Sequence, residues 1–334
     1  PHMSAQQTSA PAEPASTDAG AGLVSRLRSR LPDRITRATR VLAWLVLISN
    51  IVIVGTGGLV RLTGSGMGCE TWPYCTAESL VPTRELGIHG LIEFGNRTLT
   101  GVLVVVALLA FLSVVRMWHT RPELPRLTLA VGIGIILQAV IGGVTVWLNL
   151  HPSIVGLHYL VSAALVALSA VYVARVYAQP GPRRRAVPRR YAILTHVTSA
   201  AVLVTVVIGI LLTGSGPHAG DDAAARNGLD PIFWQHVHSW PAYVLFALTL
   251  VLFAASFRMP QVLRLPLWTG LLLGIEIVQI AVGLWQARTG LPIVLVNIHM
   301  VLAVCLVAAM TAVVMHLKAP LAVLPVADGS TAGS

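Results

Sequence analysis

The chain has 334 residues, of which 55% are hydrophobic and only 11% are charged, and its mean hydropathy is +0.76. This composition excludes an ordinary soluble domain and predicts an all-α polytopic membrane protein. The net charge of +10 would suit a nucleic-acid-binding protein, but the positions of the basic residues argue against that class. Three cysteines are too few for a disulfide-stabilised scaffold.

Both ends of the chain have a composition typical of disordered segments. The first three residues resemble a residual expression tag, and residues 4–25 are rich in Ala, Ser, Thr, Pro and Gln. We therefore expect a disordered, basic cytoplasmic N-terminus over 1–40 and a disordered tail over 317–334. The first apolar run is too long for a signal peptide, so we expect a membrane helix there.

Eight apolar runs have close to the ~20 residues that span a bilayer. They lie at residues 41–60, 88–115, 127–147, 154–178, 191–213, 232–256, 266–287 and 293–316. An even number of spans places both termini on one side of the membrane.

The arginines predict the orientation of these spans. Six precede the first run and five lie between 183 and 190, whereas the opposite loops hold only four: Arg61, Arg84, Arg226 and Arg288. The positive-inside rule therefore predicts a multi-pass protein of the plasma membrane with both termini in the cytoplasm. The positive charge then marks orientation and contact with anionic lipids, and nucleic acid is not an expected partner.

The second half of the chain repeats motifs of the first half. LTGSG occurs at 62–66 and 212–216, and the motif Gln-x-x-x-Gly begins at Gln138 and again at Gln279. Glu93-x-x-Asn96-Arg97 has its counterpart in Gln235-x-x-His238-Ser239, and the offsets are 150, 141 and 142 residues. We therefore expect tandem four-helix bundles at 41–178 and 191–316, joined by a basic linker at 179–190. A pseudo-two-fold axis along the membrane normal would relate them.

A polar stripe opens the second apolar run. His89, Glu93, Asn96 and Arg97 lie on one helix face, where each charged side chain costs roughly 2.5–3.5 kcal/mol at membrane depth. An ion pair between Glu93 and Arg97 would explain part of the stripe. Because the stripe recurs in the second half, a functional site is the stronger interpretation.

Three histidines lie one to two turns inside the predicted outer ends of their helices: His158, His238 and His299. In the second unit, His238 and His299 are on helices expected to face each other. Such a pair in an apolar bundle suits bis-imidazole ligation of haem iron in the outer half of the membrane. A single intramembrane histidine is more often a hydrogen-bonded core residue, but two at equivalent depth favour ligands. Neither HExxH nor CxxC occurs to suggest zinc.

Four stretches together resemble the bacterial haem A synthase family. They are GTGGLVRLTGSGMGCETWPYC at 55–75, IEFGNR at 92–97, GLHYLVSAALVA at 156–167 and NIHMVLA at 297–303. The resemblance covers about residues 40–317, and its first stretch is the most specific. The eight spans and the positions of the histidines agree with it independently.

The resemblance implies a membrane haem-dependent oxidoreductase. Members oxidise a methyl group of haem O to a formyl group, by successive hydroxylations and loss of water, and so make haem A for terminal cytochrome oxidase. By resemblance, haem b lies between His238 and His299, the first unit binds the substrate haem O, and Glu93 takes part in catalysis. The family also implies a disulfide between Cys69 and Cys75 in an outer loop, which fits an oxidising compartment. Contact with the haem O-forming farnesyltransferase and a place in cytochrome oxidase assembly are implied as well.

One residue departs from the family pattern. The family usually has Glu-x-x-His-Arg in the second helix, and here Asn96 occupies the histidine position. Either His158 alone holds the substrate iron and leaves its sixth position open for oxygen chemistry, or His89 substitutes. His89 lies ~10 Å from Asn96 along the helix axis, so the first interpretation is preferred. Arg97 either pairs with a haem propionate or with Glu93.

Two functions from other classes compete with this one. A dihaem b-type cytochrome that carries electrons from quinol needs two complete histidine pairs in both membrane halves, and here one pair is incomplete. A transporter would also suit parallel repeats with polar residues at membrane depth. Glu276 in the seventh run has no counterpart in the third, where Ile135 occupies the position, and we expect it to make a buried hydrogen bond.

Overall fold

The computed structural model describes residues 29–259, 262 and 264–320. Within these residues, eight helices are long and apolar enough to cross a membrane, which confirms the predicted all-α polytopic architecture. They are α2 (Arg37–Leu62), α3 (Gly87–Leu112), α4 (Glu123–Trp147), α5 (Pro152–Tyr177), α6 (Arg189–Ser215), α7 (Pro231–Ser256), α8 (Leu265–Arg288) and α9 (Ile293–Met315). Two short 3₁₀ helices, η1 (Arg84–Leu86) and η2 (Val115–Met117), flank α3.

Helices α2 and α7 begin before their apolar runs, at residues whose first turns are capped by polar side chains. Thr36 and Thr39 form a capping box that starts α2, with backbone-to-hydroxyl distances of 3.2 and 3.3 Å. The Asp230 carboxylate accepts a hydrogen bond of 2.7 Å from the Phe233 amide at the start of α7. Helices α5 and α7 also carry proline in the first turn, where a missing N–H costs nothing.

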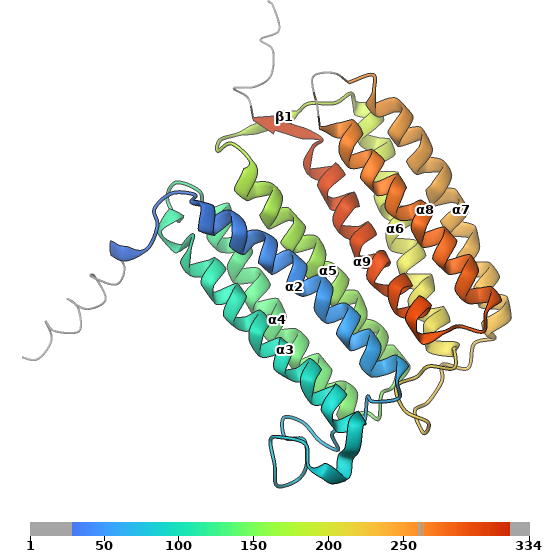
Figure 1. Cartoon of the computed structure of the whole chain (residues 1–334). Helices are drawn as coiled ribbons and strands as arrows, with labels where there is room; N and C mark the ends of the chain where they lie inside the picture. The colour runs from blue at the N-terminus through green and yellow to red at the C-terminus, as the bar shows by residue number, and fades with distance from the viewer. Residues whose placement is uncertain (1–28, 260–261, 263, 321–334) are drawn as a thin grey trace, which may run out of the picture.

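The helices form two groups in chain order (Figure 1). Helices α2–α5 lie side by side in blue to green, and α6–α9 lie beside them in yellow to red. Each group encloses its own apolar core, and α2 and α5 pack against α9 where the groups meet. This grouping matches the predicted tandem organisation, while the pseudo-two-fold axis stays a prediction.

Two segments expected to be irregular pair with each other instead. Strand β1 (Arg183–Arg185), in the predicted linker, is antiparallel to β2 (Lys318–Pro320), at the start of the predicted disordered tail. The expectation of disorder fails at Lys318–Pro320 because pairing with a strand more than a hundred residues away leaves no trace in local composition. The other predicted disordered residues, at 1–28 and 321–334, lie outside the described residues.

At the opposite end of the molecule, the two LTGSG motifs lie at the ends of α2 and α6, and the loops that follow these helices contact each other. The Gly66 amide donates a hydrogen bond of 2.8 Å to the Gly220 carbonyl. The Arg61 side chain donates to the carbonyls of His218 and Thr213, at 2.8 and 3.0 Å. These bonds fix the loop after α2 against the loop after α6, so the two helix groups are held together at the end predicted to face outward.

Candidate functional site

His238 and His299 face each other across the second helix group. His238 comes from α7 and His299 from α9, and their ring centroids are 6.3 Å apart with the planes at 70°. Two imidazoles that bind one metal ion from opposite sides, with bonds of about 2 Å, need centroids roughly 6 Å apart. The spacing therefore fits a shared haem iron.

Two glycines and two unpaired nitrogen atoms lie at these rings. The Nδ1 atom of each ring is buried and has no hydrogen-bond partner among the described residues, although buried polar atoms are normally paired. Gly209 on α6 and Gly283 on α8 stand against the rings, since a Cβ added to either would lie 3.0 Å from the facing Cε1. Both glycines therefore provide the space that the rings occupy.

The first helix group repeats part of this arrangement around His158. The Gln138 side-chain amide donates a hydrogen bond of 2.9 Å to the His158 carbonyl, and the Gln279 amide donates one of 3.1 Å to the His299 carbonyl. A Cβ added to Gly142 would lie 3.4 Å from His158 Cε1. The motif repeat found in the sequence thus corresponds to a repeated contact between neighbouring helices.

Asn96 does not reproduce the role of a facing imidazole. Its side-chain oxygen accepts a hydrogen bond of 2.7 Å from the Thr56 hydroxyl on α2. His89 is turned toward the outer loops, where its Nδ1 lies 2.8 Å from the Ser65 hydroxyl. His89 also lines a pocket of about 360 Å³ with Asp221 and Asp222 of the second outer loop. The geometry therefore favours His158 over His89 as the ligand in this half.

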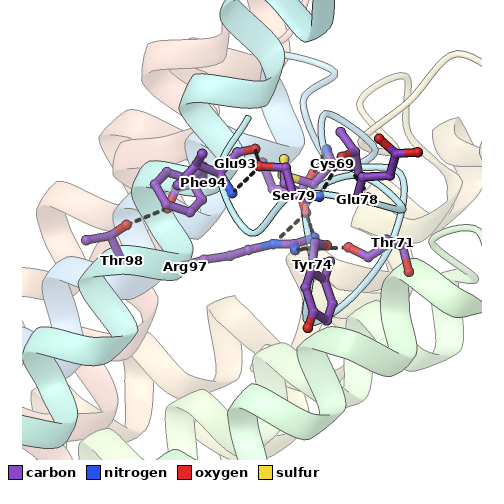
Figure 2. Close-up of a disulfide and its surroundings, with 12 residues drawn as sticks. Cys69, Thr71, Tyr74, Glu78, Ser79, Glu93, Phe94, Arg97 and Thr98 are labelled. Atoms are coloured by element: carbon purple, nitrogen blue, oxygen red, sulfur yellow. Dashed lines mark hydrogen bonds and ion pairs between the residues drawn. A yellow bond between two sulfur atoms is a disulfide. The ribbon is translucent and has the colours of Figure 1, made fainter. Parts of the chain in front are cut away.

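The predicted disulfide is present and lies directly against Glu93. Cys69 and Cys75 are bonded, and the Cys69 amide donates a hydrogen bond of 2.8 Å to Glu93 Oε2. Figure 2 shows the Glu93 carboxylate pointing from α3 into the loop that this disulfide closes, residues 69–75, which we call the cystine loop. With only 5% of its surface exposed, this carboxylate is held in one orientation.

Arg97 joins Glu93 to the rest of the loop. Its guanidinium forms an ion pair with Glu93, so the predicted pair between these residues is present. The same group donates hydrogen bonds of 3.0 and 3.1 Å to the carbonyls of Thr71 and Tyr74 (Figure 2). Four bonds to the carboxylate and the loop carbonyls occupy most of the five donors of this side chain.

The comparisons with known proteins agree with this geometry. A sequence model of the COX15-CtaA family, described as cytochrome oxidase assembly protein, matches residues 40–311. The chain belongs to this family.

Curated relatives named Heme A synthase match a shorter part of the chain. The protein of Alkalihalophilus pseudofirmus is 33% identical over 133 residues, which are 39% of this chain and 43% of that protein. The protein of Halalkalibacterium halodurans is 32% identical over 133 residues, with shares of 39% and 44%. The protein of Bacillus cereus is 34% identical over 138 residues, with shares of 39% and 43%. The matches thus span less than half the length of these relatives.

Some residues that shape the site of this protein were not predicted from the sequence. Trp72 of the cystine loop packs on α4, where Gly143 leaves room for its ring, and meets Trp147 edge to face with centroids 5.6 Å apart. Thr56, which holds Asn96, was also missed. The glycine pair at 142–143 was the available signal, because adjacent glycines in a membrane helix mark a close approach.

Glu276 does not make the expected buried hydrogen bond. It lies on α8 with 3% of its surface exposed, and neither carboxylate oxygen has a hydrogen-bond partner among the described residues. The Thr249 hydroxyl of α7 acts on this carboxyl, but neither group has a partner within hydrogen-bond distance among the described residues. The expected hydrogen bond is therefore not formed within that distance.

Proposed function

We propose that this protein is a haem A synthase, which oxidises the methyl group of haem O to a formyl group. One observation carries the proposal: a facing histidine pair in the second helix group stands beside a first group that keeps one histidine and adds a buried carboxylate. The relatives named Heme A synthase support the same reaction, although they match only two-fifths of this chain.

His238 and His299 would hold haem b through their imidazoles, and the bound haem would supply one-electron chemistry. The chain contributes the orientation of the two rings. Gly209 and Gly283 leave room for them, and Gln279 fixes the backbone of His299.

The first helix group is the proposed site of the substrate haem O. His158 would bind it on one side, and Asn96, whose amide oxygen is engaged by Thr56, would leave the other side without a strong ligand. Glu93 lies one turn before Asn96 on α3 and is held by Cys69 and Arg97. A carboxylate fixed in this way can accept or donate a proton during oxidation of the methyl group, and we propose it as the catalytic residue.

The proposed orientation places both termini in the cytoplasm and the haem sites in the outer half of the membrane. Arg61 is one of the few arginines on the predicted outer side, where the positive-inside rule expects little positive charge. Its guanidinium donates hydrogen bonds to two backbone carbonyls, so a local structural role accounts for its presence there. The haem O-forming farnesyltransferase is the proposed source of substrate.

Haem extraction and chromatography test the proposal, with protein produced beside a haem O synthase. We expect haem b together with haem O or haem A from the unmodified protein, and loss of both haem b and haem A from His238→Ala. His236→Ala is the matched control, since this exposed neighbour bonds only the Ile232 carbonyl in the described structure. A colourless unmodified protein would favour a transporter, and two b haems without haem A would favour an electron-transfer cytochrome.

A further inference from the structure

A cavity of about 610 Å³ lies between the two helix groups, at the end that carries β1 and β2. Its walls come from α2 and α5 on one side and from α8 and α9 on the other (Figure 1). Most of the lining is apolar and includes Leu47, Val173, Leu271 and Ala308. The cavity is at the opposite end from the outer loops, so it is separate from the histidine sites.

Three basic side chains line the same cavity: Arg183, Arg264 and Lys318. The pairing of β1 with β2 places Arg183 opposite Pro320 and Lys318 opposite Arg185, so two cations that are far apart in the chain belong to one small sheet. Within the described ranges, the ion pairs are Arg97 with Glu93 and Arg121 with Glu123. No described carboxylate therefore forms an ion pair with these three cations, although Glu123 attracts Arg183 from a longer distance. An apolar cavity with an unpaired basic rim is complementary to an anionic amphiphile.

Trp268 and His316 complete the rim. Their ring centroids are 5.6 Å apart with the planes tilted by 36°. The buried Trp268 Nε1 has no hydrogen-bond partner among the described residues. Burial, together with the guanidinium groups of Arg264 and Arg183, lowers the pKa of His316 below its usual value. The imidazole is therefore neutral at pH 7, and the positive charge comes from the arginines and the lysine.

We propose that this cavity binds one anionic phospholipid of the adjacent leaflet, with its phosphate among Arg183, Arg264 and Lys318 and an acyl chain along the apolar wall. The unpaired Trp268 N–H provides a donor for a headgroup or ester oxygen. The three cations select an anionic lipid over a zwitterionic lipid or a neutral quinone. The bound lipid would link α2 and α5 to α8 and α9 at the end where the outer-loop contacts do not reach.

The test measures lipid bound to the full chain by native mass spectrometry, after exchange into detergent with phosphatidylglycerol or phosphatidylcholine. We expect the unmodified protein to retain one phosphatidylglycerol and no phosphatidylcholine. Replacing Arg183, Arg264 and Lys318 with glutamine should weaken phosphatidylglycerol binding about 100-fold or more. The matched control replaces Arg189, Arg190 and Arg258, which are exposed, lie at the same end and do not line the cavity.

Further variants and competitors distinguish a bound phospholipid from free phosphate, from general surface attraction and from the chain's own C-terminal tail. Ala308→Phe keeps every charge but fills the apolar wall, and we expect it to lose the lipid. Inorganic phosphate at millimolar concentration should not displace the lipid, because it lacks an acyl chain. Equal loss in the control triple would show general surface attraction and would overturn the proposal. Lipid binding that appears only after truncation behind Pro320 would overturn it too, since the chain's own tail would then be the occupant.

Discussion

Gly283 offers a direct test of whether the position of the His299 ring matters for haem binding. A Cβ at Gly283 would lie 3.0 Å from Cε1 and 3.5 Å from Nδ1 of His299. Non-bonded carbon atoms pack at about 3.5–4.0 Å, so Gly283→Ala would push the ring by about 0.5 Å. Metal–ligand distances tolerate only about 0.2 Å. The substitution should therefore weaken the proposed ligation without removing the ligand.

We expect Gly283→Ala to lower haem b affinity by about 10- to 100-fold, the usual range for a change that misorients a metal ligand. The polypeptide should not lose stability in the same way, because alanine is favoured over glycine in a helix by roughly 0.5–1 kcal/mol. Haem b per protein is measured from the absorption spectrum of the pyridine complex, and stability is measured by heat unfolding.

Gly274→Ala is the matched control on the same helix. A Cβ there has no neighbour within 4 Å, so this variant gains the same helix propensity and should keep its haem b. Equal haem content in the two variants would refute the reasoning, because the ring would then be free to move or would not be a ligand.

Three further outcomes follow from the first helix group. Glu93→Gln should keep both haems but lower haem A output by at least about 100-fold, and normal output would rule out a catalytic carboxylate. His158→Ala should lose the substrate haem whereas Asn96→Ala should keep it, and loss of haem b from the former would contradict the assignment. Cys75→Ser should lower the free energy of unfolding by about 2 kcal/mol, and an unchanged melting temperature would show that the cystine loop is not a constraint.

The positions of the membrane helices could be predicted from the sequence because hydropathy is a local property. The ends were less predictable, since α2 begins at Arg37 through a capping box of two threonines rather than at the first apolar residue. The repeated Gln-x-x-x-Gly motif also indicated a specific contact between neighbouring helices. It marked the two places where a side-chain amide on α4 or α8 bonds the backbone of a histidine.

Contacts between distant segments could not be predicted in this way. The amide of Cys69 meets the Glu93 carboxylate only because the loop folds back over α3, and the hydroxyl of Thr56 reaches Asn96 from another helix. Sequence spacing places residues on one face of one helix, but it does not say which neighbouring helix supplies the partner. The pairing of Glu93 with Arg97 was predictable for the opposite reason, because both residues lie on one helix four positions apart.

Several departures from symmetry between the two helix groups lie together on α3, α7 and the loops before them, whereas Glu276 on α8, opposite Ile135 of α4, lies apart from them. Where α7 presents His238 to His299, α3 has Asn96, and its amide is already hydrogen-bonded to α2. Glu93 and Arg97 correspond to Gln235 and Ser239, and the loop before α7 has no cysteine. The second group therefore keeps both histidines of the proposed ligand pair. In the first group, Asn96 at the proposed ligand position lies near the buried Glu93 carboxylate and the cystine loop, which is the arrangement on which the proposed oxidation of a bound substrate rests.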